Sequence, residues 1–528
     1  MSVASELTLP PTIGSQGGVL SDLIAEQTLR FGSQTYIEHA RRERRLTFSD
    51  LARDVERWAA MFERSRIEVG STVGLVVSDP IDFSVAFLAT IAAGRWAAPL
   101  DPSTPLQGAG GMTAAVARVQ ADIVVADRSV PRGLDVDWLD LRDAPLEEAA
   151  GSSSTVAYPR HGGSGGAVLA SSGTTGTPKV IPLHQHQLLY TARAVASHHH
   201  LTSNDRGFNP LPLFHINAEV VGLLASLVAG SSLVLDDRFH RTDFWQMMAE
   251  RQITWINAVP AIVSRLADPG AGETVPTRIR FIRSASAPLP VATSSRFEAN
   301  TGIPVVETYG MTEAASQITA NPISGTRKPG SVGLPVGVEL RIDAGDSSVL
   351  DPADQAEGPH VGHVEIRGPS VITAYGGGHH GDRIDADGWL RTGDLGHFDE
   401  DGYLYLDSRV DDVINRGGEK VFPREIEEMI LLDSDVAAVA VVGAPDPELG
   451  QVPVAFLVLR GIDDESPPAL AAELLGRVRD QLSSALVRSK RPVALNVVGE
   501  LPAGPTGKVR RRDLSDRTGP VLYRLDCR

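Results

Sequence analysis

The sequence predicts an α/β fold divided between a large N-terminal domain and a small C-terminal α+β domain. Strands and helices alternate in the first part of the chain, which is typical of a parallel sheet with helices on both faces. The 528 residues are too many for one hydrophobic core, so two or more domains are expected. Near the end, the apolar runs Val436–Gly443 and Val452–Leu459 flank a turn at Ala444–Pro447 and indicate a separate small unit.

The elements of the large domain follow from apolar periodicity and from capping residues. A helix is expected over Leu20–Phe31, and Leu46–Leu51 is typical of a strand followed by the start of a helix. The apolar run Val73–Val77 predicts a buried strand, and Phe83–Ala93 predicts the helix after it. Further buried strands are expected at Ala167–Ala170, Trp255–Pro260 and Phe281–Ser284.

Composition and charge exclude several classes of protein. A net charge of −17 and a pI of about 5.3 disfavour a nucleic-acid partner or an anionic membrane. The one cysteine, Cys527, excludes a disulfide within the chain and a cysteine metal cluster. No run is apolar enough to insert in a membrane and residues 1–20 lack a signal-peptide pattern, so a cytoplasmic protein is expected. The run His198–His200 lacks further ligands nearby and is expected to be a solvated helix end.

A loop rich in hydroxyl groups and glycine follows the expected strand Ala167–Ala170. Residues 170–179 read ASSGTTGTPK. Glycine lets the backbone bring its N–H groups close to an anion, and the Ser and Thr hydroxyls and Lys179 add donors and a cation. The pattern differs from a Walker A loop, because Lys179 follows Pro178 and precedes Val180. It predicts a polyphosphate-binding loop, with a solvated surface loop as the alternative.

The stretch Val305–Glu313, VVETYGMTE, is a second candidate site. An apolar strand leads into a turn that carries an aromatic ring, a hydroxyl and a carboxylate. Tyr309 suits stacking on a purine, Thr312 suits contact with a phosphate, and Glu313 suits ligation of Mg²⁺. The alternative is a strand, turn and helix in which Thr312 is only a capping residue.

Lysine is rare in this chain. Five of the 49 basic residues are lysines and the other 44 are arginines. A compact ammonium and a planar guanidinium are not equivalent, so a retained lysine indicates a place where the ammonium matters. Lys179, Lys420 and Lys508 fall in segments that carry other candidate residues.

Several stretches together resemble the adenylate-forming superfamily, which includes acyl-CoA synthetases, peptide-synthetase adenylation domains and beetle luciferases. They stand in the family's order and span most of the chain, and Asn321–Gly337 is most similar to oxalyl-CoA synthetase-like members. The matching stretches are the loop SGTTGTPK at 172–179, YGMTE at 309–313, WLRTGDL at 389–395, SRVDDVINRGGEK at 408–420 and PTGK at 505–508.

The resemblance implies a fold and a domain boundary. Residues 1–410 would form the large domain, with parallel-rich sheets packed with helices and a β-barrel-like subdomain. Residues 411–528 would form a small mobile domain that pivots at Asp411. His215 would line an acyl pocket near the reacting carboxylate, with the apolar helix Val220–Leu227 as its wall.

The resemblance also implies a set of site residues. The implied catalytic residues are Lys508, His215, Thr312 and Glu313, with Glu313 also the ligand of Mg²⁺. Coenzyme A would approach the side formed by Gly417, Gly418 and Lys420. The implied nucleotide-binding residues are Ser171, Thr174, Thr175, Lys179, Ser286, Ala287, Tyr309, Gly310, Thr312, Asp394 and Arg409.

The activity implied is that of an acyl-CoA ligase. A small-molecule carboxylic acid would attack the α-phosphate of ATP to give an acyl-adenylate, and the thiol of coenzyme A would then displace AMP. The acid, from fatty-acid or natural-product metabolism, is not readable from the sequence, and a monomer and a homodimer both stay open.

Other activities on the same scaffold also stay open. Three positions where glycine is usual hold Val180, Ala285 and Ser408, and a branched Val180 beside the phosphate loop would impair the first half-reaction. An enzyme that only forms thioesters from preformed acyl-adenylate therefore stays open as a minority alternative. A stand-alone adenylation enzyme that loads a carrier-protein thiol would share the motifs, although no carrier domain follows Arg528, which favours coenzyme A. A luciferase-type oxygenase and a non-catalytic binding protein are less favoured, the latter because Glu313 and Lys508 are both present.

Overall fold

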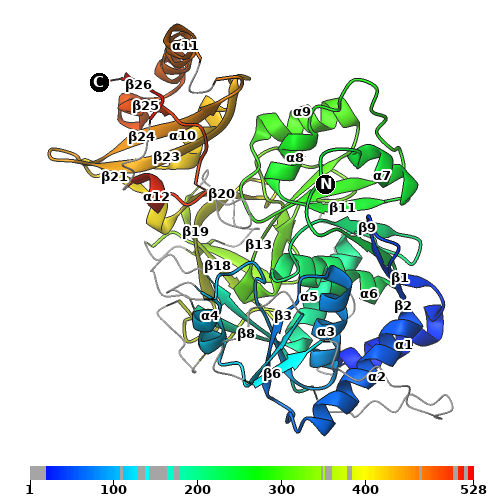
Figure 1. The fold of residues 1–528 in the computed structure, drawn as a ribbon. Helices are drawn as coiled ribbons and strands as arrows, with labels where there is room; N and C mark the ends of the chain where they lie inside the picture. The colour runs from blue at the N-terminus through cyan, green and yellow to red at the C-terminus, as the bar shows by residue number, and fades with distance from the viewer. Residues whose placement is uncertain are drawn as a thin grey trace, which may run out of the picture.

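The computed structural model describes residues 19–106, 111–127, 137–141, 163–171, 179–345, 349–350, 360–376, 383–462, 466–502, 509–515 and 521–527. These residues form four sheets. Figure 1 shows a large body and, at its upper left, a smaller unit that holds the last strands and helices. Within these ranges, no helix is both long and apolar enough to cross a membrane.

The first sheet lies in the large body and has the strand order β6-β5-β3-β4-β7-β8. Five strands run parallel, and β8 returns antiparallel to β7. Helices α3 (Pro80–Ala92) and α4 (Met112–Val119) pack against it. Its strands are β3 (Thr72–Val76), β4 (Trp96–Pro99), β5 (Ile123–Ala126), β6 (Asp137–Asp140), β7 (Gly166–Ser171) and β8 (Lys179–His184).

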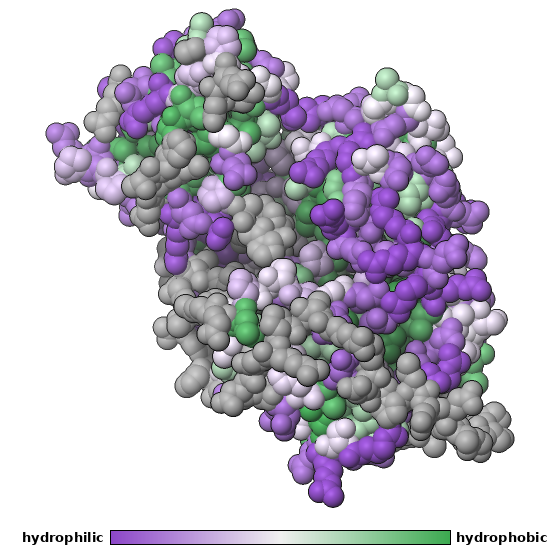
Figure 2. Space-filling model, in the orientation of Figure 1, coloured by the Kyte–Doolittle hydropathy of each residue, from purple (hydrophilic) through white to green (hydrophobic). Residues whose placement is uncertain are grey.

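The second sheet has nine strands in the order β15-β14-β13-β12-β11-β9-β10-β1-β2, and the six from β13 to β1 run parallel. Its strands are β1 (Thr35–His39), β2 (Arg45–Thr47), β9 (Arg206–Asn209), β10 (Ser232–Leu235), β11 (Trp255–Ala258), β12 (Phe281–Ser284), β13 (Val305–Met311), β14 (Ser316–Ala320) and β15 (Leu334–Pro335). The remaining helical segments of the large body are α1 (Leu20–Phe31), α2 (Phe48–Arg64), α5 (Gln185–His198), the π-helix η1 (Asn217–Leu224), α6 (Ala225–Ala229), α7 (Phe244–Glu250), α8 (Pro260–Leu266), α9 (Val291–Thr301) and the 3₁₀ turn η2 (Thr312–Ala314). Hydrophilic side chains cover the face over α7, α8 and α9 (Figure 2).

The start of α2 illustrates how local sequence determines an element. The Thr47 hydroxyl accepts a hydrogen bond from the backbone N–H of Asp50 at 3.0 Å, and the Asp50 carboxylate accepts one from the N–H of Thr47 at 3.0 Å. This reciprocal capping box contributes about 1 kcal/mol to the helix. The strand and helix start expected at Leu46–Leu51 are therefore confirmed, as is the helix expected over Leu20–Phe31.

The third sheet is antiparallel and is built from the last five strands of the large body. Its order is β17-β16-β18-β19-β20. It ends at the 3₁₀ turn η3 (Val410–Asp412), which leads into the small unit. Its strands are β16 (Glu339–Asp343), β17 (Val349–Leu350), β18 (Gly362–Arg367), β19 (Leu390–Phe398) and β20 (Leu404–Arg409).

The fourth sheet belongs to the small unit, which has a hydrophobic core of its own. Its path is β22-β21-β24-β25-β26, and β23 pairs with β24. Its strands are β21 (Ile414–Arg416), β22 (Glu419–Val421), β23 (Val436–Asp446), β24 (Gly450–Leu459), β25 (Ala494–Val497) and β26 (Tyr523–Asp526). Its helical segments are α10 (Pro423–Ile430), α11 (Pro468–Ala485), the 3₁₀ turn η4 (Arg488–Lys490) and α12 (Arg512–Ser515).

Four expectations from the sequence are wrong in detail. The strand expected at Trp255–Pro260 ends at Ala258, and Pro260 begins α8. The predicted turn at Ala444–Pro447 begins too early, because β23 stays paired with β24 through Asp446. The run expected to be one apolar helix at Val220–Leu227 is split between η1 and α6. The His198–His200 run is not simply a solvated helix end, because His199 is fully buried against Trp255 and Phe281.

A buried carboxyl of the large body lies near the small unit. Arg424 of α10 donates to the carbonyl oxygens of Leu406 at 2.8 Å and Gly330 at 3.2 Å. Glu307 of β13 is close enough to Arg424 for their charges to interact. Burial raises the pKa of Glu307 to about 7, against the weaker opposing effect of Arg424.

This shift predicts how stability depends on pH. Between pH 4.5 and 7, the folded chain keeps Glu307 protonated while the unfolded chain loses that proton. The contribution of Glu307 is therefore fully present below about pH 4.5 and is lost as the pH rises through 7, by about 3 kcal/mol at most. In Glu307→Gln the melting temperature should change less over this pH window than in the wild type. Parallel curves for the two proteins would contradict the assignment.

Candidate active site

A cleft of about 440 Å³ opens in the large body where its two parallel sheets present their strand ends. The ends of β7, β12 and β13 contribute Ala170, Ser286 and Gly310 to its lining. Ligands of open parallel sheets bind outside the carboxyl ends of the strands, so this is the expected place for a site. The cleft also includes the predicted residues His215 and Thr312.

Three predicted residues meet beside this cleft although they lie on three strands. The Tyr309 hydroxyl donates to the Asp394 carboxylate at 2.5 Å, and the Arg409 Nε lies 3.2 Å from the same carboxylate. Asp394 and Arg409 are register partners in β19 and β20. Burial, helped by Asp394, raises the pKa of Tyr309 well above its usual range, so the hydroxyl stays a donor. The trio offers an aromatic ring, a carboxylate and a guanidinium, which can together bind a nucleoside.

A second group surrounds the buried carboxylate of Glu313. The Tyr375 hydroxyl donates to Glu313 at 3.2 Å, and Arg383 lies 3.9 Å from it. The Lys179 ammonium lies over the Tyr375 ring, 4.6 Å from its centroid. The structure thus brings Lys179, at the end of the phosphate-loop candidate, into the same group as Glu313.

The backbone at the cleft is tightly constrained at Gly310. A Cβ at this position would lie 1.6 Å from the carbonyl oxygen of Ser316, so only glycine fits. The pairing of β13 with β14 shifts register between Tyr309 and Gly310. Ser286 has a φ of +76°, an unfavourable angle for a side chain other than glycine, and strain of this kind is often found at functional sites.

His215 lies deep in the cleft wall. Its burial lowers the pKa of the imidazole, an effect that Asp101 opposes, so the ring is neutral at pH 7. Its Nε2 is buried and has no hydrogen-bond partner among the described residues. A neutral ring with a free nitrogen can bind an uncharged or anionic group of a substrate.

Val180 does not crowd the start of β8. It pairs with Ala170 in extended conformation, which favours β-branched residues, and its side chain packs on a hydrophobic cluster. The carbonyl oxygen of Val180 accepts a hydrogen bond from the N–H of Gly376 at 2.8 Å. A side chain at position 376 would collide with Val180, because its Cβ would lie 2.8 Å from the Val180 Cβ; glycine avoids this. These contacts account for Val180 within β8, while the loop at 172–178 that it was expected to crowd lies outside the described residues.

The comparisons with known proteins decide the family. A model of the AMP-binding enzyme matches residues 24–376, and a model of the AMP-binding enzyme C-terminal domain matches residues 425–508. The chain belongs to the AMP-binding enzyme family.

Relatives of this AMP-binding enzyme span almost its whole length. It is similar to a sulfoacetate–CoA ligase of Cupriavidus necator, with 34% identity covering 94% of this chain and 97% of the relative. It is similar to an oxalate–CoA ligase of Arabidopsis thaliana, with 32% identity covering 88% and 92%. The structure of the O-succinylbenzoate coenzyme A synthetase of Bacillus subtilis in complex with ATP and a magnesium ion matches with a TM-score of 0.77 and 26% identity, covering 94% of this chain and 99% of that one.

The other predicted residues of the AMP-binding enzyme lie in different places. Ala287 is half-buried just beyond the cleft-lining Ser286, and Ser171 ends β7. Gly417 and Gly418, with φ of 59° and 93°, form the turn between β21 and β22, as a tight hairpin requires. Exposed Asp411 and Lys420 belong to the small unit and its connection. Thr174, Thr175 and Lys508 lie outside the described residues.

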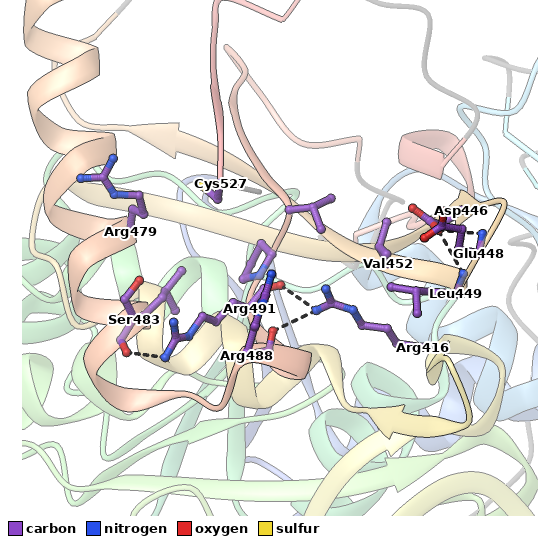
Figure 3. A pocket seen from close by; sticks show the side chains of 13 residues that line it. Arg416, Asp446, Glu448, Leu449, Val452, Arg479, Ser483, Arg488, Arg491 and Cys527 are labelled. Carbon is purple, nitrogen blue, oxygen red and sulfur yellow. Dashed lines mark hydrogen bonds between the residues drawn. The ribbon is translucent and has the colours of Figure 1, made fainter.

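The small unit of the AMP-binding enzyme holds a second cavity of about 400 Å³, lined by four arginines (Figure 3). One Nη of Arg416 donates to the carbonyl oxygens of Arg488, Ser489 and Arg491. Arg491 donates to the carbonyl oxygens of Leu486 at 2.8 Å and Ser483 at 2.6 Å. These bonds hold the cations around a cavity next to the Gly417–Gly418 turn.

Sequence reasoning missed several residues of the site. Tyr375, Arg383 and Arg283 were not singled out, and neither were Asn217 and Asp101. Each stands in an ordinary core or loop segment, so no local pattern marks it. The one available signal is the rarity of lysine, which singled out Lys179; a search for the partner of Lys179 would then have indicated Tyr375.

Asp394 gives a direct test of the nucleotide site. Replacing Asp394 with asparagine removes the charge that binds Arg409, so the KM for ATP should rise by about tenfold to a hundredfold. Asp407→Asn is the matched control, because Asp407 lies on β20 and hydrogen-bonds to His397 instead. Equal KM values for the two variants would show that Asp394 does not contact the nucleotide.

Proposed function

We propose that this AMP-binding enzyme performs a two-step ligation at the cleft described above. The chain is an AMP-forming acyl-CoA ligase: it activates a carboxylic acid as acyl-AMP and transfers the acyl group to coenzyme A. The observation that carries the assignment to this cleft is the meeting of the Tyr309–Asp394–Arg409 trio and the Glu313 group beside one cavity that also contains His215.

In the first step an oxygen of the acid forms a bond to the α-phosphorus of ATP, and the bond to pyrophosphate breaks. One anion attacks another, so the step requires positive charge and fixed positions. Lys179 is held at the Glu313 group and supplies one cation. Thr174, Thr175 and Lys508 would supply further donors, while Ser286, Ala287, Gly310 and Thr312 would border the phosphates and the base. Asp394 would accept hydrogen bonds from the ribose hydroxyls.

Glu313 fits a role as ligand of Mg²⁺. It is a buried carboxylate that accepts a hydrogen bond from the neutral Tyr375 and lies 3.9 Å from Arg383, so no residue that the structure describes forms a close ion pair with it. Protein sites for Mg²⁺ commonly use one or two carboxylates together with substrate phosphates. The ion would neutralise charge on the phosphates, and Tyr375 would orient the carboxylate.

In the second step the thiol of coenzyme A attacks the acyl carbon, and AMP leaves with the oxygen that came from the acid. The arginine-lined cavity beside Gly417, Gly418 and Lys420 supports coenzyme A as the acceptor, because its phosphates need cations. A carrier-protein thiol and preformed adenylate are not favoured as alternatives, since the relatives named above are CoA ligases and Val180 fits its strand.

The first step requires Lys508 at the reacting phosphate, and the second requires the coenzyme A side of the small domain at the acyl group. The small domain, residues 411–528, is therefore proposed to rotate about Asp411 between the steps. Proline at 411 would restrict φ near −65° and block this rotation. In Asp411→Pro one half-reaction should survive and the other should fall at least about a hundredfold. Both are measured separately, with Asp411→Ala as the control. Unchanged overall turnover of Asp411→Pro would rule out the alternation.

The proposed function is tested by incubating the enzyme with ATP, Mg²⁺, coenzyme A and a panel of acids. AMP and one acyl-CoA thioester should form in equal amounts, detected by mass spectrometry. ADP as the nucleotide product, or no product with any acid, would contradict the function. A cytoplasmic location remains the proposal from the sequence, and size-exclusion chromatography distinguishes a monomer from a homodimer.

A further inference from the structure

A buried cation without a counter-ion lies at the wall of the cleft. Arg283 of β12 is 1% exposed and lines the cavity. Among the described residues, no carboxylate forms an ion pair with it. Burial lowers its pKa to about 9, so the guanidinium still carries its charge at neutral pH. A buried charge costs free energy unless an opposite charge or hydrogen bonds compensate it.

The partners that hold Arg283 are neutral amides. Its Nη1 donates to the side-chain oxygens of Asn217 at 2.8 Å and Asn257 at 3.1 Å. Its Nη2 lies 3.5 Å from the side-chain oxygen of Gln317. Asn257 is in turn held by Asn209, because the Nδ2 of Asn257 donates to the side-chain oxygen of Asn209 at 2.9 Å. These amides come from β9, β11, β14 and η1, so Arg283 is positioned from several sides.

The same group leaves three buried donors without an acceptor. They are the Nε of Arg283, the Nδ2 of Asn217 and the Nε2 of Gln317. The orientation of both amides follows from Arg283, since a guanidinium only donates and each amide must present its oxygen to it. Two unpaired amide donors and the unpaired Nε of the cation define a place for an anion with several oxygens.

The carboxyl of Glu219, on the same π-helix as Asn217, does not supply that anion. Glu219 is fully buried on η1, and both its oxygens lack a hydrogen-bond partner. Its burial raises its pKa well above the usual range, so the group is protonated and neutral. The described residues therefore give Arg283 neutral hydrogen-bond partners and no negative charge.

We propose that the acid activated in this cleft carries a second anionic group, a carboxylate or a sulfonate, which binds Arg283 and Asn217. The inference rests on the proposed function and adds the class of substrate. The Nη1 of Arg283 already donates to two amides. The parallel N–H groups of its Nε and Nη2 remain, and this pair is the one that binds an oxyanion in bidentate geometry. Arg283 is then a specificity-determining residue, while the first carboxylate reacts with ATP elsewhere in the cleft.

The test compares acids that differ only at the second group. The pairs are malonate with propionate, succinate with butyrate, glutarate with valerate, and sulfoacetate with propionate. For at least one pair, kcat/KM of AMP formation by the wild type should favour the dianion by about a hundredfold or more. In Arg283→Met that preference should vanish, because kcat/KM for the dianion should fall to about that for the matching monoacid. Arg280→Met is the control, because Arg280 precedes β12 and pairs with Asp205.

Melting temperatures separate this role from a structural one. Arg283→Met removes an uncompensated buried charge, so its melting temperature should equal or exceed that of the wild type. Asn217→Asp places a carboxylate beside Arg283 and should raise the melting temperature while abolishing the preference for dianions. A large drop in melting temperature for both variants would assign Arg283 to the core and overturn the proposal.

The outcomes also separate this inference from the proposed function. If the wild type forms thioesters of monoacids as fast as those of their dianionic partners, the ligase stands and the second-anion site is wrong. If the wild type forms AMP from none of the acids, the proposed function fails first.

Discussion

Replacing Lys508 with alanine is expected to slow formation of acyl-adenylate severely and to spare formation of thioester from synthetic acyl-adenylate. The lysine is proposed to neutralise charge when the acid attacks the α-phosphate, and that charge develops in the first step only. Loss of one such cation should slow adenylation by about a hundredfold to a thousandfold. The measurement is pyrophosphate release for the first step and AMP release from added adenylate for the second.

Lys490→Ala is the matched control for this variant. Lys490 also lies in the small unit, but its ammonium forms an ion pair with Glu425 at 2.8 Å. The control should retain both half-reactions. If Lys508→Ala slows the two half-reactions equally, the residue does not act on the attacked phosphate.

Glu313→Gln is expected to have the second largest effect. A neutral amide is a poor ligand for a hard cation, so adenylation should slow by about a hundredfold, and more Mg²⁺ should be needed for half-maximal rate. The amide keeps the shape of the side chain and still accepts from Tyr375, so the fold should be retained. Titration of Mg²⁺ at saturating ATP measures the shift.

Glu298→Gln controls for the loss of one negative charge. Glu298 lies on α9, and the ion pair recorded for it is with Arg327. Its Mg²⁺ titration should match that of the wild type. A wild-type titration in Glu313→Gln would assign the metal to another ligand.

Local patterns predicted the elements whose cause is local. The helix over Leu20–Phe31 and the strand Phe281–Ser284 match the structure, because apolar spacing acts within the segment. The end of β23 was missed, since Ala444–Asp446 resembles a turn and only pairing with β24 keeps it extended. His199 was missed for the same reason: two aromatic rings from distant strands bury it.

The candidate site divides in the same way. Tyr309, Asp394 and Arg409 belong to recognisable stretches, and the structure brings them together as such stretches imply. Arg283 stands inside a strand that reads as plain core. Its importance depends on amides from four other elements, and no spacing along the chain brings these to notice. Missing counter-ions and orphaned donors are properties of the folded molecule, so they became visible only in three dimensions.

The central claim is that the acid becomes joined to AMP before the thioester forms. It is tested most directly by supplying an acid with ¹⁸O in its carboxylate, together with ATP, Mg²⁺ and coenzyme A, and measuring the mass of the AMP product by mass spectrometry. Attack of the carboxylate on the α-phosphate leaves its oxygen with AMP when the thiol displaces it. The account predicts AMP that has gained one ¹⁸O for each thioester formed. Unlabelled AMP, or label in inorganic phosphate accompanied by ADP, would contradict it.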